Sequence, residues 1–277
     1  MIERSWEMEM ADGFSLGAVE VRASDNETPS QTALVLHGGP GASFDYLRPQ
    51  MDSLVSPTRR LVYYDQRGGG RSVGLGMMPA AGIEEHLADL RDVIASLGGK
   101  PALVGYSWGG LLALRFALDH PEAIERLLLV APAPPWAAAR AIMRTQMKRA
   151  AERPEAKAFV ATLDRSDRRQ RFAGAVVGYF YDPRRALELS PFMVRERAER
   201  GVWDSLADYD LRPRLASLSM PTFIAHGTED PIPIDGSREI AARSNARLLQ
   251  IPACGHCPFI EGADAFFPAA TAFLDER

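Results

Sequence analysis

The chain has 277 residues, of which 46% are hydrophobic and 25% are charged, and its formal net charge is −4 at pH 7. This composition is typical of a folded protein with a sizeable core and excludes a disordered chain or a small disulfide-stabilised module. The acidic balance and the absence of a basic run argue against nucleic acid as a partner. With two cysteines, no secretory signal and no membrane-spanning run, we expect a cytoplasmic protein that does not contact a membrane.

The first expected elements are two strands around a tight turn. Residues 6–10 and 14–21 are strand-like, and Asp12 and Gly13 between them form a dipeptide typical of hairpins. We therefore expect an antiparallel hairpin at the start of the fold.

Short apolar segments then alternate with helical stretches. The helix expected over residues 82–97 has Ile83, Leu87, Leu90 and Ile94 on one face, and a second helix is expected over residues 111–118. The expected strands are residues 33–36, 61–64, 102–104, 127–130, 222–225 and 247–251. Continuous apolar runs of this length indicate strands buried on both faces, so the pattern predicts an α/β fold with a doubly wound, mostly parallel sheet.

The alternation stops between residues 133 and 215, where the sequence is helical and rich in Arg and Ala. We interpret residues 133–215 as an inserted helical cap, and residues 1–132 with 216–277 as the core domain. The cap has 17 basic and 11 acidic residues, or +6, whereas the rest has 15 and 25, or −10. We interpret this charge as a solvated helical surface rather than a charge-selective lid.

The strongest local signal is a G-x-S-x-G motif at residues 105–109, between an expected strand and a helix. In this setting it predicts a nucleophile elbow, a turn so sharp that only glycine fits at Gly105 and Gly109. Ser107 is then the candidate nucleophile, with its hydroxyl exposed above the sheet.

A serine hydroxyl needs a base and an acid that orients the base. Asp230 and His256 each follow an expected strand, in the chain order Ser, Asp, His. The carboxyl ends of parallel strands meet at one edge, where open α/β sheets place their sites. The sequence therefore predicts a triad of Ser107, Asp230 and His256, with Glu229 as the alternative acid.

An oxyanion hole is expected from the glycine-rich segment 37–41, which leaves the strand at 33–36. We assign one donor to the N–H of Gly39 and the other to the N–H of Trp108, because glycine lets backbone approach a substrate oxygen. His37 precedes this turn at the strand end, and we expect it to have a structural hydrogen-bonding role.

Five motifs together resemble a known family: HGGPG at 37–41, DQRGGGRS at 65–72, the S-W-G after residue 106, GTEDP around 230 and GHCP around 256. The set resembles the α/β-hydrolase superfamily and, within it, the HGGPG, DQRG and S-W-G motifs are similar to those of the proline iminopeptidase family. That resemblance implies an α/β-hydrolase fold and a cofactor-free serine aminopeptidase that releases an N-terminal residue, often proline, from short peptides. By the same likeness, Asp65 and the glycines after it shape a loop near the site.

The cap departs from the family pattern. It lacks a Trp-rich segment ending in Trp-Glu, whose acid in the larger proline iminopeptidases helps to hold the substrate ammonium. Five acids are unranked candidates for that role: Glu152, Glu155, Glu188, Glu196 and Asp204. The departure keeps a carboxylesterase or lactonase acting on a small ester open as an alternative. A non-catalytic ligand receptor on the same fold is a further one. The oligomeric state stays open.

Two other patterns are interpreted as structural. Cys254 to Cys257 reads CGHC, but too few residues follow it for a thioredoxin domain, so we expect neither a redox role nor a zinc site, and no metal or cofactor. The methionines at 143, 147 and 193 are interpreted as packing residues rather than as a pocket lining.

Overall fold

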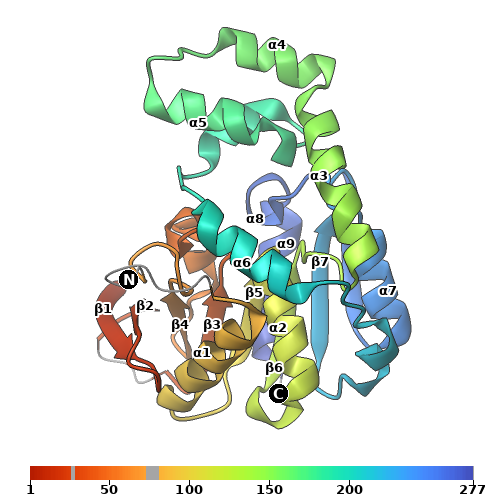
Figure 1. Cartoon of the computed structure of the whole chain (residues 1–277). Helices are drawn as coiled ribbons and strands as arrows, with labels where there is room; N and C mark the ends of the chain where they lie inside the picture. Colours follow the sequence, from red (N-terminus) through yellow and green to blue (C-terminus); the bar gives the residue numbers. More distant parts are fainter. Residues whose placement is uncertain (26–28, 73–80, 277) are drawn as a thin grey trace.

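The computed structural model describes residues 1–25, 29–72 and 81–276. These residues form a sheet with the strand order β1-β2-β4-β3-β5-β6-β7-β8 (Figure 1). The strands are β1 (Ile2–Glu9), β2 (Ser15–Arg22), β3 (Gln31–Leu36), β4 (Arg59–Tyr64), β5 (Ala102–Tyr106), β6 (Arg126–Val130), β7 (Thr222–Gly227) and β8 (Arg247–Ile251). Every strand expected from the sequence is present, with shifts of a few residues at the ends.

The N-terminal hairpin is antiparallel, as predicted. β1 pairs with β2 and β2 with β4 in antiparallel register, whereas all later pairs are parallel. Gly13 supplies the positive φ of the turn, at 78°, and Asp12 instead accepts a hydrogen bond from the N–H of Phe14. β1 begins at Ile2 rather than at residue 6, because backbone pairing with Arg22 extends a strand whose outer residues are polar.

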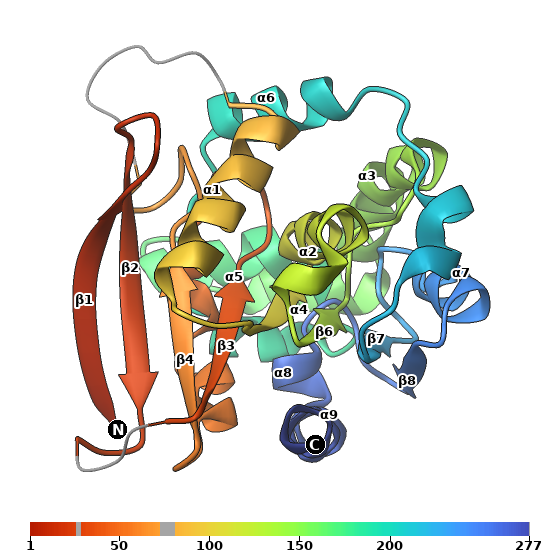
Figure 2. The same ribbon diagram turned by 90° about the horizontal axis from the view of Figure 1, so that it is seen from below.

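Helices cover both faces of the sheet, as a doubly wound fold requires (Figure 2). One face packs against α1 (Ile83–Ser96), α2 (Trp108–Asp119) and α7 (Asp235–Arg243). The other packs against the 3₁₀ segment η2 (Gln50–Leu54), α8 (Pro258–Glu261) and α9 (Ala263–Asp275). No described helix is long and apolar enough to span a bilayer.

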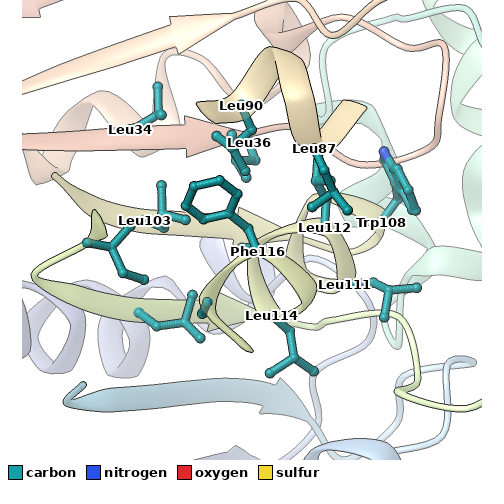
Figure 3. Close-up of a cluster of buried hydrophobic side chains, with 14 of the residues drawn as sticks. Leu34, Leu36, Leu87, Leu90, Leu103, Trp108, Leu111, Leu112, Leu114 and Phe116 are labelled. Carbon is teal, nitrogen blue, oxygen red and sulfur yellow. The ribbon is translucent and has the colours of Figure 1, made fainter. Parts of the chain in front are cut away.

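The strands alternate their side chains between two apolar clusters. Leu34 and Leu36 of β3 lie on the same side as Leu90 of α1 and Phe116 of α2 (Figure 3). Val35, between the two leucines, belongs to the cluster on the opposite face. Burial on both faces explains why these strands read as continuous apolar runs.

Four α-helices lie between β6 and β7: α3 (Ala137–Ala151), α4 (Pro154–Thr162), α5 (Arg168–Val176) and α6 (Glu196–Leu206). α4 and α5 stand away from the sheet, and α6 returns to the core (Figure 1). The two ends of this stretch are joined, because the N–H of Ala137 donates to Tyr209 at 2.9 Å and that of Leu211 to Pro135 at 2.8 Å. These bonds support the predicted cap, residues 133–215, as a unit; its boundaries stay a prediction. We call these residues the cap segment.

α2 begins at Trp108, three residues earlier than expected, because Ser107 alone forms the turn from β5. Such a turn requires close backbone contact. A Cβ on Gly105 would lie 2.4 Å from the carbonyl oxygen of Gly109, and a Cβ on Gly109 would lie 2.3 Å from that of Leu36. Both glycines are therefore required by packing.

Gly105→Ala should lower the free energy of unfolding by about 1–3 kcal/mol or more, since the methyl group meets backbone that cannot move aside. The matched control is Gly99→Ala, because a Cβ there has nothing within 4 Å. It should change stability by less than about 0.5 kcal/mol. Urea unfolding of both variants measures the difference, and equal stabilities would contradict the packing argument.

Candidate active site

Ser107 occupies a strained backbone conformation at the carboxyl end of β5. Its φ is 54° and its ψ is −117°, a region that non-glycine residues rarely adopt. Neighbouring backbone holds it there: its N–H donates to Val130 at 3.0 Å, and its carbonyl accepts from Ala133 at 2.9 Å. The side chain is half-buried, so its hydroxyl is reachable from outside.

The structure brings the three predicted side chains together. Nε2 of His256 lies 3.0 Å from Oγ of Ser107, and Nδ1 lies 2.8 Å from Oδ2 of Asp230. Because an ionised carboxylate can only accept hydrogen bonds, Nδ1 of His256 carries the proton. Nε2 is then free to accept a hydrogen bond from the serine hydroxyl. The alternative acid, Glu229, is exposed and hydrogen-bonds to Thr228. The geometry favours Asp230.

A second histidine, which sequence reasoning missed, also contacts Asp230. Nε2 of His226 lies 3.2 Å from Oδ2 of Asp230 and 3.1 Å from the carbonyl oxygen of Ile232. Its Nδ1 lies 2.7 Å from Oγ of Ser237. The available signal was the four-residue spacing between His226 and Asp230 at the end of β7.

The two histidines determine the charge state of Asp230. Burial alone would raise its pKa, but the charges of His256 and His226, together with their hydrogen bonds, lower the pKa to about 2. The N–H of Ile232 also donates to Oδ1 at 2.7 Å. Asp230 is therefore ionised at any pH near neutrality.

The two expected oxyanion donors border the same cavity as Ser107. Trp108 is the first residue of α2, where N–H groups have no partner within the helix. Gly39 has a φ of 49°, which favours glycine. A Cβ on Gly38 would lie 2.9 Å from Cβ of Ser107, so this glycine permits the close approach of the loop.

Gln66 connects three of the sequence motifs, a role that sequence reasoning missed. Its N–H donates to Nε2 of His37 at 3.0 Å, and its side-chain amide donates to the carbonyl of His37 at 2.8 Å. Its Oε1 accepts from Nε1 of Trp108 at 2.7 Å. His37 is fully buried, and burial lowers its pKa, which agrees with the structural role expected for it.

Asp65 shapes the neighbouring loop. Its carboxylate accepts from the N–H groups of Phe44 at 2.9 Å and Arg71 at 2.8 Å. A Cβ on Gly70 would lie 2.2 Å from this carboxylate. These contacts agree with the loop-shaping role that the family resemblance implies.

A small cavity of about 110 Å³ opens above Ser107. Its lining is largely aromatic and aliphatic, and includes Tyr46, Tyr106, Met143, Met147, Phe192 and Trp203. The interpretation of Met143 and Met147 as packing residues alone is therefore wrong, because the side of α3 that carries them faces the cavity. Met193 is 72% exposed.

Glu199 is the single carboxylate among the described residues that line this cavity. The five acids considered from sequence, Glu152, Glu155, Glu188, Glu196 and Asp204, are all exposed and are not among the lining residues. Glu199 was missed, although it stands four residues before Trp203 and so shares its face of α6. The ring of Trp203 packs edge-on against that of Trp108, with 5.3 Å between the ring centroids.

The two cysteines beside His256 are buried free thiols. Burial raises the pKa of both Cys254 and Cys257, the reverse of what a reactive thiol requires. Sγ of Cys257 lies 3.5 Å from the hydroxyl of Tyr106. Within the described residues, His, Cys, Asp and Glu form no group of three or more that could hold a metal ion.

Comparison with known proteins identifies relatives that share this fold. The family model for the alpha/beta hydrolase fold matches residues 33–263. A proline iminopeptidase of Lactobacillus helveticus is 26% identical over 88% of this chain and 90% of its own length. A pimeloyl-[acyl-carrier protein] methyl ester esterase of Pectobacterium carotovorum is 27% identical over 79% and 85%.

Among solved structures, the proline iminopeptidase of Mycobacterium smegmatis superposes with a TM-score of 0.72. It covers 98% of this chain and 97% of its own, at 21% sequence identity. This likeness concerns the fold and agrees with the eight-stranded sheet and its N-terminal antiparallel hairpin.

The lowered pKa of Asp230 makes a prediction about acid stability. Since its folded pKa of about 2 lies below the ordinary 3.8, the stabilisation is complete above pH 3.8 and is lost as the pH falls toward 2. The difference in free energy of unfolding between the wild type and Asp230→Asn should therefore become smaller as the pH falls through this range. Urea unfolding between pH 5 and pH 2.5 measures it. The exposed neighbour provides the control Glu229→Gln, for which a narrowing of equal size would contradict the argument.

Proposed function

Because this chain belongs to the alpha/beta hydrolase family, we propose that it is a serine hydrolase in which Ser107, His256 and Asp230 form the catalytic triad. Three observations support the proposal: the strained turn at Ser107, the 3.0 Å and 2.8 Å contacts of His256, and the cavity above the hydroxyl. The reaction proceeds through an acyl-enzyme.

In the first half, Nε2 of His256 takes the proton of Ser107 while Oγ attacks the substrate carbonyl. Asp230 holds the imidazole in the required tautomer and stabilises its positive charge. The N–H groups of Gly39 and Trp108 bind the developing oxyanion. The tetrahedral intermediate then expels the amine or alcohol, which receives the proton from His256. Water, deprotonated by the same nitrogen, releases the acyl group and restores Ser107.

Glu199 carries the proposal that the substrate is a short peptide with a free N-terminus, such as one that begins with proline. Glu199 is the single carboxylate among the described residues of a largely aromatic and aliphatic lining, and no hydrogen bond or ion pair of its side chain is found with other described residues. An unpaired carboxylate in the cavity that Ser107 also lines suits an ammonium group. No arginine or lysine is among the described residues that line the cavity, although Arg140 packs on the ring of Trp203 at 4.8 Å. Many of the other cap arginines are exposed, where solvent and salt screen their charges.

A second candidate is a carboxylesterase acting on a small neutral ester. The apolar lining of the cavity favours it, because the aromatic and methionine side chains can hold an uncharged acyl group without Glu199. The esterase relative is named for a methyl ester, which the same triad chemistry cleaves.

Ser107→Ala should lower kcat on the order of 10⁴ to 10⁶-fold for every substrate, since it removes the group that forms the covalent bond. Circular dichroism and thermal unfolding of the variant check that the fold is retained. Substantial turnover by a folded Ser107→Ala protein would refute the mechanism.

The charge of the substrate separates the two candidates. N-acetylation of a prolyl arylamide removes the ammonium, so kcat/KM should fall about 10- to 200-fold if Glu199 pairs with it. Glu199→Gln should cause a similar loss for the free amine and leave the acetylated substrate unaffected. Steady-state kinetics of both substrates, alongside a neutral aryl ester, measure these effects.

The matched control for this experiment is Glu196→Gln, an exposed acid on the same helix, which should leave both substrates unchanged. Equal rates for the free and acetylated amides, or ester turnover far above both, would favour the esterase. If Glu199→Gln loses the preference for the free amine and Glu196→Gln keeps it, the amine-binding role belongs to Glu199.

A further inference from the structure

Glu261, the last residue of α8, accepts hydrogen bonds from three backbone N–H groups. Its Oε2 accepts from Gly255 at 2.7 Å and from Tyr181 at 3.1 Å, and its Oε1 accepts from Asp182 at 2.8 Å. Gly255 lies in the loop of residues 252–257 between β8 and α8, here called the histidine loop. Tyr181 and Asp182 belong to the cap segment. One carboxylate therefore joins the histidine loop to the cap segment.

The same two segments also meet at the candidate base. The N–H of His256 donates to the carbonyl of Tyr179 at 2.6 Å, and the two rings lie 5.4 Å apart in an edge arrangement. A Cβ on Gly255 would lie 2.2 Å from that carbonyl oxygen, so the backbones are in close contact. Tyr179 also lines the cavity above Ser107.

The histidine loop depends on contacts of this kind for its shape. It lies outside both β8 and α8, and α8 has only four residues. Ala253 has a φ of 51°, a conformation that is unfavourable for alanine. Hydrogen bonds from N–H groups to a carboxylate are roughly twice as strong as neutral ones, so Glu261 is a strong anchor for this loop.

Burial makes the ionised form of Glu261 less favourable in the folded chain. Burial raises its pKa, which means that the folded chain disfavours the ionised form despite its three donors. The nearby charge of Arg185 lowers the pKa of Glu261 only in part; its guanidinium pairs with Glu188 and donates to the carbonyl of Ile260 at 2.7 Å. A carboxylate kept under these conditions and bonded to two separate segments indicates a role besides stability.

We infer that Glu261 is a positioning residue that holds the histidine loop, and with it Nε2 of His256, within hydrogen-bond reach of Ser107. The inference rests on the proposed role of His256 as the base. A displacement of about 1 Å at a catalytic group can cost on the order of 10²-fold in rate.

The test compares Glu261→Ala, which removes all three acceptors, with Glu261→Gln, whose carbonyl oxygen can keep the bonds to Gly255 and Tyr181. Glu261→Ala should lower kcat about 10- to 100-fold and change KM less than about threefold, because the base is displaced while the cavity is retained. Glu261→Gln keeps two of the three bonds but loses the one from Asp182, so its kcat should fall by a smaller factor, roughly 3- to 10-fold. A purely structural role would not produce that division between kcat and KM.

Hydrogen exchange followed by mass spectrometry gives a readout that does not depend on the substrate. Peptides covering residues 179–182 and 252–257 should exchange at least about tenfold faster in Glu261→Ala, and the central strands should be unchanged. Asp264→Asn, an exposed acid in the first turn of α9, is the control and should match the wild type in both measurements.

Wild-type kcat, or unchanged exchange at both peptides, in Glu261→Ala would overturn the inference. If Glu261→Ala does not fold, Glu261→Gln decides alone. For Glu261→Gln, faster exchange at residues 179–182 together with a roughly 3- to 10-fold lower kcat supports the inference. Wild-type exchange and wild-type kcat in this variant overturn it. Failure of the proposed function is distinguishable, because active Ser107→Ala protein would disprove the triad while leaving the exchange result intact.

Discussion

The geometry of the candidate site depends on the one-residue turn between β5 and α2. The positive φ of Ser107 costs about 1–3 kcal/mol, and the turn persists because β6 and the start of the cap segment bond to its backbone. Gly105 and Gly109 permit the close contact of strand and helix. This turn directs the serine hydroxyl to the edge where β7 and β8 end, which is where Asp230 and His256 lie.

Charge in the site is local and differs from the charge of the surrounding segment. Asp230 is fully buried between two histidines, which hold its pKa low against the effect of burial. The cap segment has a net charge of +6, yet the described part of its wall contributes a single charged residue to the cavity, the acid Glu199. Charges separated by more than about 10 Å of solvent are largely screened. The total charge of the cap segment is therefore a poor guide to its substrate.

Two polar side chains outside the triad connect parts of the site that are far apart in the chain. Gln66 joins the backbone of His37 to the indole of Trp108, so it links both loops that are proposed to bind the oxyanion. Glu261 joins the histidine loop to residues 179–182 of the cap segment. Both use several hydrogen bonds from one side chain, which fixes position more firmly than packing alone.

The sequence by itself determined the strands, two of the helices that cover them, α1 and α2, and the three residues that meet at the sheet edge; α7, α8 and α9 were not predicted. Strands buried on both faces give continuous apolar runs, and G-x-S-x-G specifies its turn within five residues. Asp230 and His256 each follow a predicted strand, and the chain order Ser, Asp, His identified them as the other two residues. Only the tertiary structure decided the partners: the contact of His226 with Asp230, the link through Gln66, and the positions of Glu199 and Glu261. Each depends on backbone or side chains brought near by packing, and local sequence carries no signal for the distance between such groups.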